Sequence, residues 1–110
     1  MIVNINDVNS LLKILKENSM VVLYFYAIWN HNCIKFEKIF YNIIEYYRKL
    51  PIVFCKIDID LFPNIIDFYK INIFNLPCVV MIKNNNIINM IYGLKPKTCE
   101  DSLYDFYLSR

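Results

Sequence analysis

The chain has 110 residues, a formal net charge of +2 and 57% hydrophobic residues. This length predicts one domain over residues 1–110, large enough to bury roughly two-thirds of the surface of the unfolded chain. Lysines are scattered and no basic stripe with interleaved aromatic residues occurs, which gives no support to direct nucleic-acid binding. The longest apolar run, Met20 to Trp29, is shorter than the about 20 residues of a membrane-spanning helix, so no membrane partner is expected.

The N-terminus and the cysteines bear on the cellular compartment. Residues 1–6 lack a charged region followed by a long apolar stretch, so no secretory signal is expected. The irregularly spaced cysteines do not resemble a disulfide-stapled secreted domain, and we expect Cys55 in a strand and Cys99 at the surface or half-buried. A reducing, cytoplasmic location follows. No Cys/His spacing matches a zinc motif and one glycine cannot form a phosphate-binding loop, so neither metal nor cofactor is expected.

The first third of the chain predicts a strand, a helix and a second strand. Residues 1–5 are expected to form a short strand. Asn6 or Asp7 can cap a following helix that runs through Leu15, because apolar residues recur there at helical spacing. Residues 20–27 are an almost unbroken apolar run, which is typical of a central strand buried on both faces.

The middle third repeats this alternation. Apolar side chains recur at helical spacing from about residue 30 to residue 50, and Pro51 is expected to end this helix. Residues 52–58 predict the next strand. Pro63 can occupy the first turn of a further helix that ends at about Tyr69, since proline is favoured at that position.

The last third predicts a hairpin and a final helix. Two short strands are joined by an Asn-rich turn, because asparagine tolerates positive φ and can stand in for glycine. The strands cover residues 79–83 and 87–92, and the turn is Asn84-Asn85-Asn86. The final helix is expected to begin at Thr98 or Glu100 and to end at Leu108. Together these elements predict an α/β fold with a mixed sheet covered on both faces.

The stretch Trp29-Asn30-His31-Asn32-Cys33 lies where the strand over residues 20–27 gives way to a helix. Asn30 suits the helix N-cap, since its side-chain oxygen can accept a hydrogen bond from a free backbone N–H. Cys33 falls about one turn into the helix, where a cysteine is usually buried. His31 is interpreted as a solvent-facing loop residue, because side chains at i and i+2 do not face each other on a helix.

This junction resembles the active site of the thioredoxin family, whose members carry Trp-Cys-X-X-Cys there. Further matches to the family follow in order along the chain. They are Val21–Trp29, Phe54–Asp60, Leu76-Pro77 and Tyr92-Gly93-Leu94-Lys95-Pro96, with the only glycine at a family glycine position. The resemblance implies a thioredoxin fold, in which helices flank a central mixed sheet and Pro77 is cis.

The chain departs from the family pattern at the centre of the site. Asn30 replaces the cysteine whose thiolate attacks a substrate disulfide. Tyr24 stands where the family usually buries an aspartate that moves protons, although the neighbouring Lys56 remains. By comparison with the family, residues 69–77 are about two residues longer. The resemblance therefore implies a degenerate site with Cys33 as its single cysteine, which is not a standard dithiol disulfide reductase.

The family resemblance also implies a surface for docking peptides. Its residues form an apolar groove around the proline loop, and they are Trp29, Leu76, Pro77, Tyr92 and Gly93. An extended peptide could pair with the Leu76 backbone. The alternative is that Leu76 and Tyr92 only cover the core.

Cys78 leaves a second set of alternatives open. It follows Pro77, and the family fold brings this loop close to Cys33, so a Cys33–Cys78 disulfide is a candidate if the two Cα atoms lie within about 7 Å. The spliceosomal thioredoxin-like proteins resemble this chain in lacking the first cysteine and carrying Pro-Cys at the loop. The other interpretation is a buried strand residue without redox chemistry.

Three functional expectations follow from these residues. The first is a cytoplasmic thioredoxin-like protein of thiol and redox homeostasis, which binds thiol-containing or extended-peptide partners and has at most weak activity through Cys33. The second is a non-enzymatic assembly protein of the spliceosomal type, located in the nucleus. The third is a reductase that pairs Cys33 with Cys78. The sequence assigns no oligomeric state.

Overall fold

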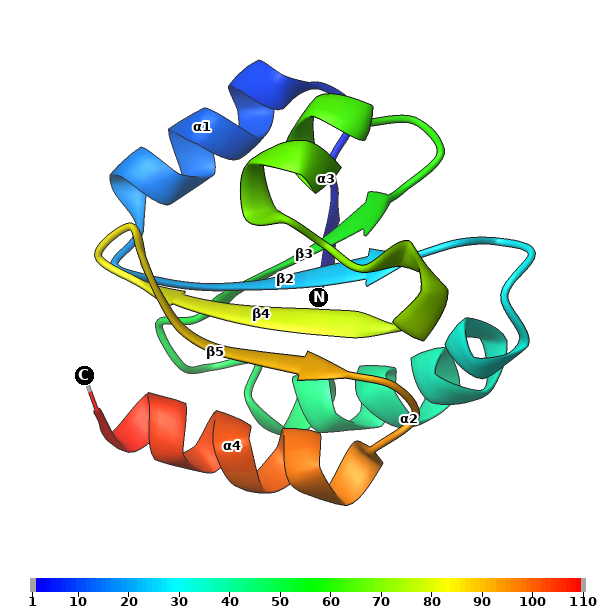
Figure 1. Cartoon of the computed structure of the whole chain (residues 1–110). Coiled ribbons are helices and arrows are strands. Elements are labelled where there is room, and N and C mark those ends of the chain that lie inside the picture. The colour runs from blue at the N-terminus through cyan, green and yellow to red at the C-terminus, as the bar shows by residue number, and fades with distance from the viewer. Residues whose placement is uncertain (1, 110) are drawn as a thin grey trace.

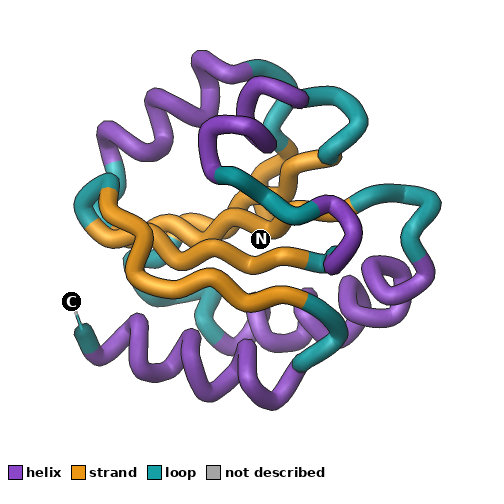
Figure 2. Tube along the Cα trace, viewed as in Figure 1, coloured by secondary structure: helices purple, strands orange, loops and turns teal. Residues whose placement is uncertain are grey.

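The structure is a computed structural model that describes residues 2–109 (Figure 1). A five-stranded sheet runs through the middle of the molecule, with α1 and α3 on one face and α2 and α4 on the other (Figures 1 and 2). The elements in chain order are β1 (Ile2–Asn4), α1 (Val8–Glu17), β2 (Met20–Tyr26), α2 (His31–Tyr46), β3 (Val53–Asp58), α3 (Pro63–Tyr69), the short 3-10 helix η1 (Ile73–Asn75), β4 (Cys78–Lys83), β5 (Asn86–Tyr92) and α4 (Pro96–Leu108). This arrangement confirms the predicted α/β fold.

The strand order places three chain segments at one end of the sheet. The order is β1-β3-β2-β4-β5, in which β3 pairs parallel with β1 and β2, and β4 pairs antiparallel with β2 and β5. Cys78 at the start of β4 lies opposite Phe25 of β2 and Tyr92 of β5. The end of β2, the start of β4 and the end of β5 therefore meet beside the N-terminus of α2 (Figure 1).

Alternate side chains of the central strand β2 belong to two apolar cores, one on each face of the sheet. Val21, Leu23 and Phe25 pack toward α1 and α3, whereas Val22 and Tyr24 pack toward α2 and α4. Successive side chains of a strand point to opposite faces, so a strand covered on both sides must be apolar along its whole length. Burial of every residue from Met20 to Phe25 confirms the prediction made from the unbroken apolar run.

The N-terminal elements agree with the prediction except at their ends. The strand covers Ile2–Asn4 rather than residues 1–5, and Met1 lies outside the described residues. Asp7, one of the two predicted caps, accepts a hydrogen bond from the Ser10 backbone N–H at 2.8 Å. The helix continues two residues beyond Leu15, to Glu17. These differences are of the size by which helix ends commonly fray.

The predicted helix over residues 30–50 is too long. α2 ends at Tyr46, and the next residues form a tight turn in which the Leu50 N–H bonds to the Tyr47 carbonyl at 3.0 Å. The residue before a proline avoids helical backbone angles, so the chain must leave the helix ahead of Pro51.

No helix among residues 2–109 combines the length and the hydropathy needed to cross a membrane.

Two expectations in the C-terminal part were wrong. α4 begins at Pro96, not at Thr98 or Glu100, because a proline suits the first turn of a helix as well here as in α3. Cys99 was expected at the surface or half-buried but is buried against the α2 and α4 face of the sheet. Cys99 lies on the same face of α4 as the buried Leu103 and Phe106, which are four and seven residues further along.

Two residues of the Asn-rich turn have the predicted backbone conformation. Asn84 and Asn85 have φ values of 48° and 69°, a region that asparagine tolerates. Gly93 also has a positive φ, of 89°, which glycine adopts without steric cost. The hairpin was therefore predicted correctly, but β4 begins one residue earlier, at Cys78, and Asn86 belongs to β5 rather than to the turn.

Candidate functional site

The start of α2 carries the amide of Asn30 at the position where the family pattern has a reactive cysteine. The Asn30 Oδ1 atom accepts a hydrogen bond from the Cys33 backbone N–H at 3.0 Å, which confirms the predicted N-cap. Cys33 itself is only 2% exposed. A buried thiol under an amide cap cannot be reached by a substrate disulfide without movement of the helix start.

The surroundings of Cys33 also suppress its ionisation. Burial raises the pKa of the Cys33 thiol above its usual value, and the negative charge of Glu37 raises it further. Hydrogen bonds from the Ala27 backbone and the Tyr24 hydroxyl oppose this shift without cancelling it. The thiolate is the nucleophilic form of cysteine, so Cys33 is a poor nucleophile at neutral pH.

Tyr24 occupies the position beneath Cys33 as a neutral hydrogen-bond donor. Its side chain is fully buried, and its hydroxyl donates to the Cys33 backbone carbonyl at 3.3 Å. The ring packs with those of Phe36 and Phe40, with centroids 5.8 and 5.2 Å away. Burial raises the pKa of Tyr24 far above its usual value, so this residue does not accept protons near neutral pH. Burial of this strand was predicted, but the hydrogen bond of Tyr24 to the Cys33 carbonyl was not.

Lys56 forms an ion pair with Glu37, in place of the aspartate that the family pattern has at the position of Tyr24. Its Nζ atom lies 2.8 Å from the Glu37 Oε1 atom and 3.1 Å from the Tyr41 hydroxyl, and it sits 4.5 Å from the centre of the Tyr26 ring. Burial by itself lowers the pKa of Lys56, but the hydrogen bonds to Glu37 and Tyr41 outweigh that effect and raise it. The ammonium group therefore stays charged, and it holds the Glu37 carboxylate beside Cys33.

These polar groups share one small cavity. It has a volume of about 230 Å³ and is lined by Tyr24, Tyr26, Ala27, Ile28, Cys33, Ile34, Glu37 and Lys56. The Glu37–Lys56 ion pair thus faces the same space as the Cys33 thiol. Sequence reasoning missed Glu37, although its position four residues after Cys33 places the two side chains on one face of the helix.

Trp29 presents its ring at the surface beside the helix start. The side chain is 60% exposed, and its Nε1 atom donates to the Asp60 Oδ2 atom at 2.8 Å. Asp58 in turn accepts a hydrogen bond from the Asp60 backbone N–H at 2.9 Å. Asp60 is exposed and also orients the tryptophan, and no local sequence signal connects residues 31 positions apart.

The proline loop leaves unpaired backbone groups just before β4. The Leu76–Pro77 peptide bond is cis, and the Gly93 N–H donates to the Pro77 carbonyl at 2.8 Å. Leu76 is 2% exposed, so its side chain covers the core as the alternative interpretation held. The Leu76 backbone N–H and carbonyl have no hydrogen-bond partner among residues 2–109.

Five exposed apolar side chains lie in the loop before α2, in the turn after β3 and in η1. Phe74 of η1 is 89% exposed, and Ile28, Trp29, Leu61 and Ile73 are also exposed. We call these five residues the apolar rim. Trp29 is bonded to Asp60, the neighbour of Leu61, and Ile73 and Phe74 lie within four residues of Pro77 in the chain. Phe74 and Ile73 belong to the segment that the family comparison indicated as longer.

Cys78 is deeper in the protein than Cys33. It is fully buried, and burial raises the pKa of its thiol to about 12, although a hydrogen bond with the Tyr92 hydroxyl works against this shift. The Tyr92 hydroxyl also accepts a hydrogen bond from the Asn72 N–H at 2.9 Å. Cys33 and Cys78 lie in the same apolar cluster, and both are free thiols in this structure. The disulfide between them stays a prediction.

His31 is the first residue of α2 and not a loop residue, but its side chain is exposed as predicted. Within residues 2–109, no three side chains of histidine, cysteine, aspartate or glutamate come together in a way that could hold a metal ion.

Comparison with known proteins adds to this geometry. The family model described as Thioredoxin matches residues 2–105. Monothiol glutaredoxin-4 from Saccharomyces cerevisiae is 33% identical over 86 residues, which cover 78% of this chain and 34% of that protein. This chain therefore spans about a third of the length of the curated relative that it matches.

Solved thioredoxin structures superimpose on nearly the whole chain. Thioredoxin from Trypanosoma brucei brucei has a TM-score of 0.86 at 21% identity, covering 96% of this chain and 89% of that one. Oxidised mitochondrial thioredoxin 3 from Saccharomyces cerevisiae has a TM-score of 0.80 at 25% identity, covering 94% of each chain. The family match, the cis-Pro77 loop and the strand–helix junction at Asn30 lead to one conclusion. This chain belongs to the thioredoxin family.

Proposed function

We propose that this protein is a binding member of its family, with a role in thiol and redox homeostasis and at most weak disulfide oxidoreductase activity. The observation that carries this proposal is the hydrogen bond between Asn30 and the Cys33 N–H. It places a chemically inert amide at the half-buried attacking position and leaves the remaining thiol buried beneath it. In this proposal the protein still binds a partner but lacks the attacking cysteine that would reduce the partner's disulfide.

The surface around Leu76 supports binding of an extended polypeptide. The unpaired N–H and carbonyl of Leu76 can pair with one strand residue of a partner, as in strand addition, once a small movement of the loop exposes them. The apolar rim, with Trp29 held by Asp60, offers contact area on either side of that pairing. The proposed partner is therefore an extended, thiol-containing segment whose neighbouring residues are apolar.

The proposed residual chemistry is thiol–disulfide exchange at Cys33. A Cys33 thiolate would attack one sulfur of a partner disulfide, so one S–S bond forms, one breaks, and the partner's other sulfur leaves as a thiolate. The proton must first leave Cys33, and Glu37 is the carboxylate that lines the same cavity. Burial and the raised pKa of Cys33 keep this step slow. The printed name of the curated relative, a monothiol glutaredoxin, is compatible with a single-cysteine site.

The decisive experiment restores the missing cysteine. Purified Asn30→Cys protein is compared with the unchanged protein in an insulin-type disulfide reduction assay. Asn32→Cys serves as the matched control, because it adds a thiol to the same helical turn without the Cys-X-X-Cys spacing. We expect slow reduction by the unchanged protein, a clear gain for Asn30→Cys and no gain for Asn32→Cys. Reduction by the unchanged protein at the rate of a dithiol thioredoxin would refute the proposal.

The assembly-protein interpretation uses the same surface and differs in its partners. It predicts co-purification with ribonucleoprotein particles and a nuclear location. The third interpretation, a reductase that pairs Cys33 with Cys78, predicts loss of activity in Cys78→Ser. Mild oxidation followed by alkylation and mass spectrometry distinguishes it from the binding interpretation, because only the paired reductase yields a reversible Cys33–Cys78 bond.

A further inference from the structure

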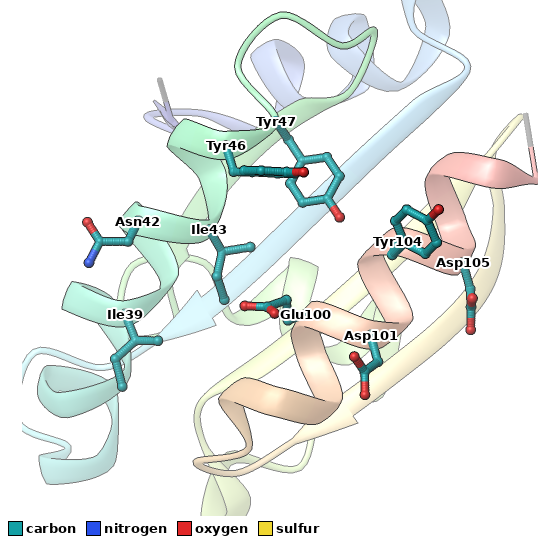
Figure 3. Close-up of a pocket in the computed structure, with 9 residues that line it drawn as sticks. All are labelled: Ile39, Asn42, Ile43, Tyr46, Tyr47, Glu100, Asp101, Tyr104 and Asp105. Atoms are coloured by element: carbon teal, nitrogen blue, oxygen red, sulfur yellow. The ribbon is translucent and has the colours of Figure 1, made fainter.

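A second cavity lies on the other helix layer, between α2 and α4 (Figure 3). Its volume is about 670 Å³, within the range of about 300–1,000 Å³ that is usual for ligand sites. It is lined by Ile39, Asn42, Ile43, Tyr46, Tyr47, Glu100, Asp101, Tyr104 and Asp105. None of these residues belongs to the apolar rim or to the cavity around Cys33.

The charge of this cavity is opposite to that of the whole chain. Three carboxylates and no basic side chain line it, although the net charge of the protein is +2. Asp101 is paired with Lys97 at 3.1 Å, whereas Glu100 and Asp105 form no ion pair with any residue between 2 and 109. Glu100 extends toward Ile43 of α2, and the two aspartates point away from α2 (Figure 3). Glu100 is thus an unpaired carboxylate that faces the space between the helices (Figure 3).

Three tyrosines line the same cavity as Glu100 and lie on one side of it (Figure 3). Tyr46 is 82% exposed and Tyr104 is also exposed, so their rings are accessible from solvent. The ring centroids of Tyr46 and Tyr47 lie 5.3 Å apart, at an interplanar angle of 72°. Aromatic faces set at an angle to each other beside a carboxylate form the kind of cage that attracts organic cations.

Tyr47 contributes a polar group to the same cavity. The residue is only 4% exposed, yet its hydroxyl points into the space between the helices (Figure 3). That hydroxyl makes no hydrogen bond among residues 2–109, and its oxygen keeps contact with solvent, because no buried side-chain oxygen in this part of the chain lacks a partner. Burial and the charge of nearby groups, Glu100 among them, raise the pKa of Tyr47, so the hydroxyl stays neutral and able to accept a hydrogen bond.

We propose that this cavity binds the guanidinium group of an arginine side chain in a partner polypeptide. A guanidinium is planar, stacks on aromatic faces and carries five donors, which match the Glu100 carboxylate and the Tyr47 hydroxyl. The apolar stem of the arginine would lie against Ile39 and Ile43. A lysine ammonium is a compact point charge and satisfies fewer of these groups at once. The site is separate from the surface around Leu76, so it stands whether or not the proposed function holds.

The first test is an NMR titration of the ¹⁵N-labelled full chain with the peptide Ac-Gly-Arg-Gly-NH₂. We expect saturable shifts of the Tyr47, Glu100 and Tyr104 amides and none around Leu76. The same peptide with citrulline keeps the shape of arginine and removes its charge, so it should not saturate. A lysine peptide should bind more weakly. Failure of the arginine peptide to saturate, or equal binding of the citrulline peptide, would overturn the proposal.

The second test changes the cage without disturbing the core. Glu100→Gln should weaken binding of the arginine peptide about tenfold, as loss of a charge-assisted pair implies. Tyr46→Ala removes an exposed ring, and Tyr47→Phe removes only a hydroxyl, so each should weaken it by a few-fold. Glu17→Gln at the end of α1 makes the same change of net charge far from the cavity and should leave affinity unchanged. Equal affinities of Glu100→Gln and Glu17→Gln would show that only overall charge matters and would refute the site.

Discussion

The Lys56 Nζ atom lies 2.8 Å from the Glu37 Oε1 atom, and the pair lines the cavity that contains Cys33. A carboxylate from helix α2 therefore stands behind the cysteine, while the strand beneath it carries Tyr24. Lys56 is therefore paired with a carboxylate of helix α2, whereas the family pattern has its acidic residue in the strand, at the position of Tyr24. Glu37 and Tyr24 act on Cys33 in opposite directions, and this opposition can be measured.

Glu37→Gln should lower the pKa of Cys33. The Glu37 charge raises that pKa, and its removal also leaves the positive charge of Lys56 uncompensated beside the thiol. Thiolate absorbance at 240 nm, followed against pH, reports the titration. Glu45→Gln, on the same helix but beyond the cavity, is the matched control. A Cys33 titration that is unchanged or shifted upward in Glu37→Gln would contradict this assignment.

Tyr24→Phe should raise the pKa of Cys33. The hydroxyl stabilises the thiolate, and the ring that fills the core is kept by this substitution. Loss of the buried hydrogen bond should also reduce the free energy of unfolding by about 1 kcal/mol. The same absorbance titration and urea unfolding measure both effects. Opposite shifts in Tyr24→Phe and Glu37→Gln are the signature of the arrangement, and shifts in one direction would refute it.

Asn30→Ala should destabilise the protein by about 1 kcal/mol, because the cap of α2 loses its side-chain acceptor. Urea unfolding gives the free energy of the variant. Asn32→Ala changes the same residue type in the same turn, and its side chain makes no hydrogen bond with residues 2–109. We expect this control to unfold like the unchanged protein. Equal destabilisation by both substitutions would show that the cap is not the cause.

Stability should fall as the pH rises above about 9. Burial raises the thiol pKa of Cys55, Cys78 and Cys99 from 9.0 to about 12, so the unfolded chain releases these protons first. A raised folded pKa gives stability that is complete below the unfolded value and is lost as the pH rises toward the folded value. Each cysteine should contribute about 1 kcal/mol of this loss at pH 10.

The pH effect can be assigned to individual thiols. Urea unfolding at pH 7 and pH 10, under reducing conditions, is compared for the unchanged protein and Cys99→Ala. Between pH 7 and pH 10 the free energy of unfolding of the variant should fall less than that of the unchanged protein, by the contribution of one buried thiol. An identical loss in both proteins would mean that the buried thiols do not cause it.

Phe74→Ala should weaken binding of an extended apolar peptide, because it removes the most exposed ring of the apolar rim. Loss of a stacked aromatic contact predicts an effect of about 1 kcal/mol. Trp29 is the only tryptophan, so its fluorescence reports occupancy of this surface. Phe68→Ala removes an equally exposed ring from α3, outside the rim, and should bind like the unchanged protein. Equal affinities of the two variants would contradict the docking surface.

The sequence by itself determined the order of elements and the chemistry of the degenerate position. The apolar run of β2, Pro63 at the start of α3 and the Asn84-Asn85 turn depend on local backbone and burial preferences, which are visible in neighbouring residues. The Asn30 cap is local as well, because it joins residues three positions apart. Replacement of the attacking cysteine could therefore be understood before the fold was known.

Only the tertiary structure decided which distant residues meet. The bonds from Trp29 to Asp60 and from Lys56 to Glu37 join residues 31 and 19 positions apart, and no spacing rule predicts them. The tyrosine cage beside Glu100 likewise forms only because the sheet holds α2 beside α4 (Figure 3). Such contacts depend on how the helices pack on the sheet. Their energies come from burial and pairing in three dimensions, which a linear pattern of residues does not contain.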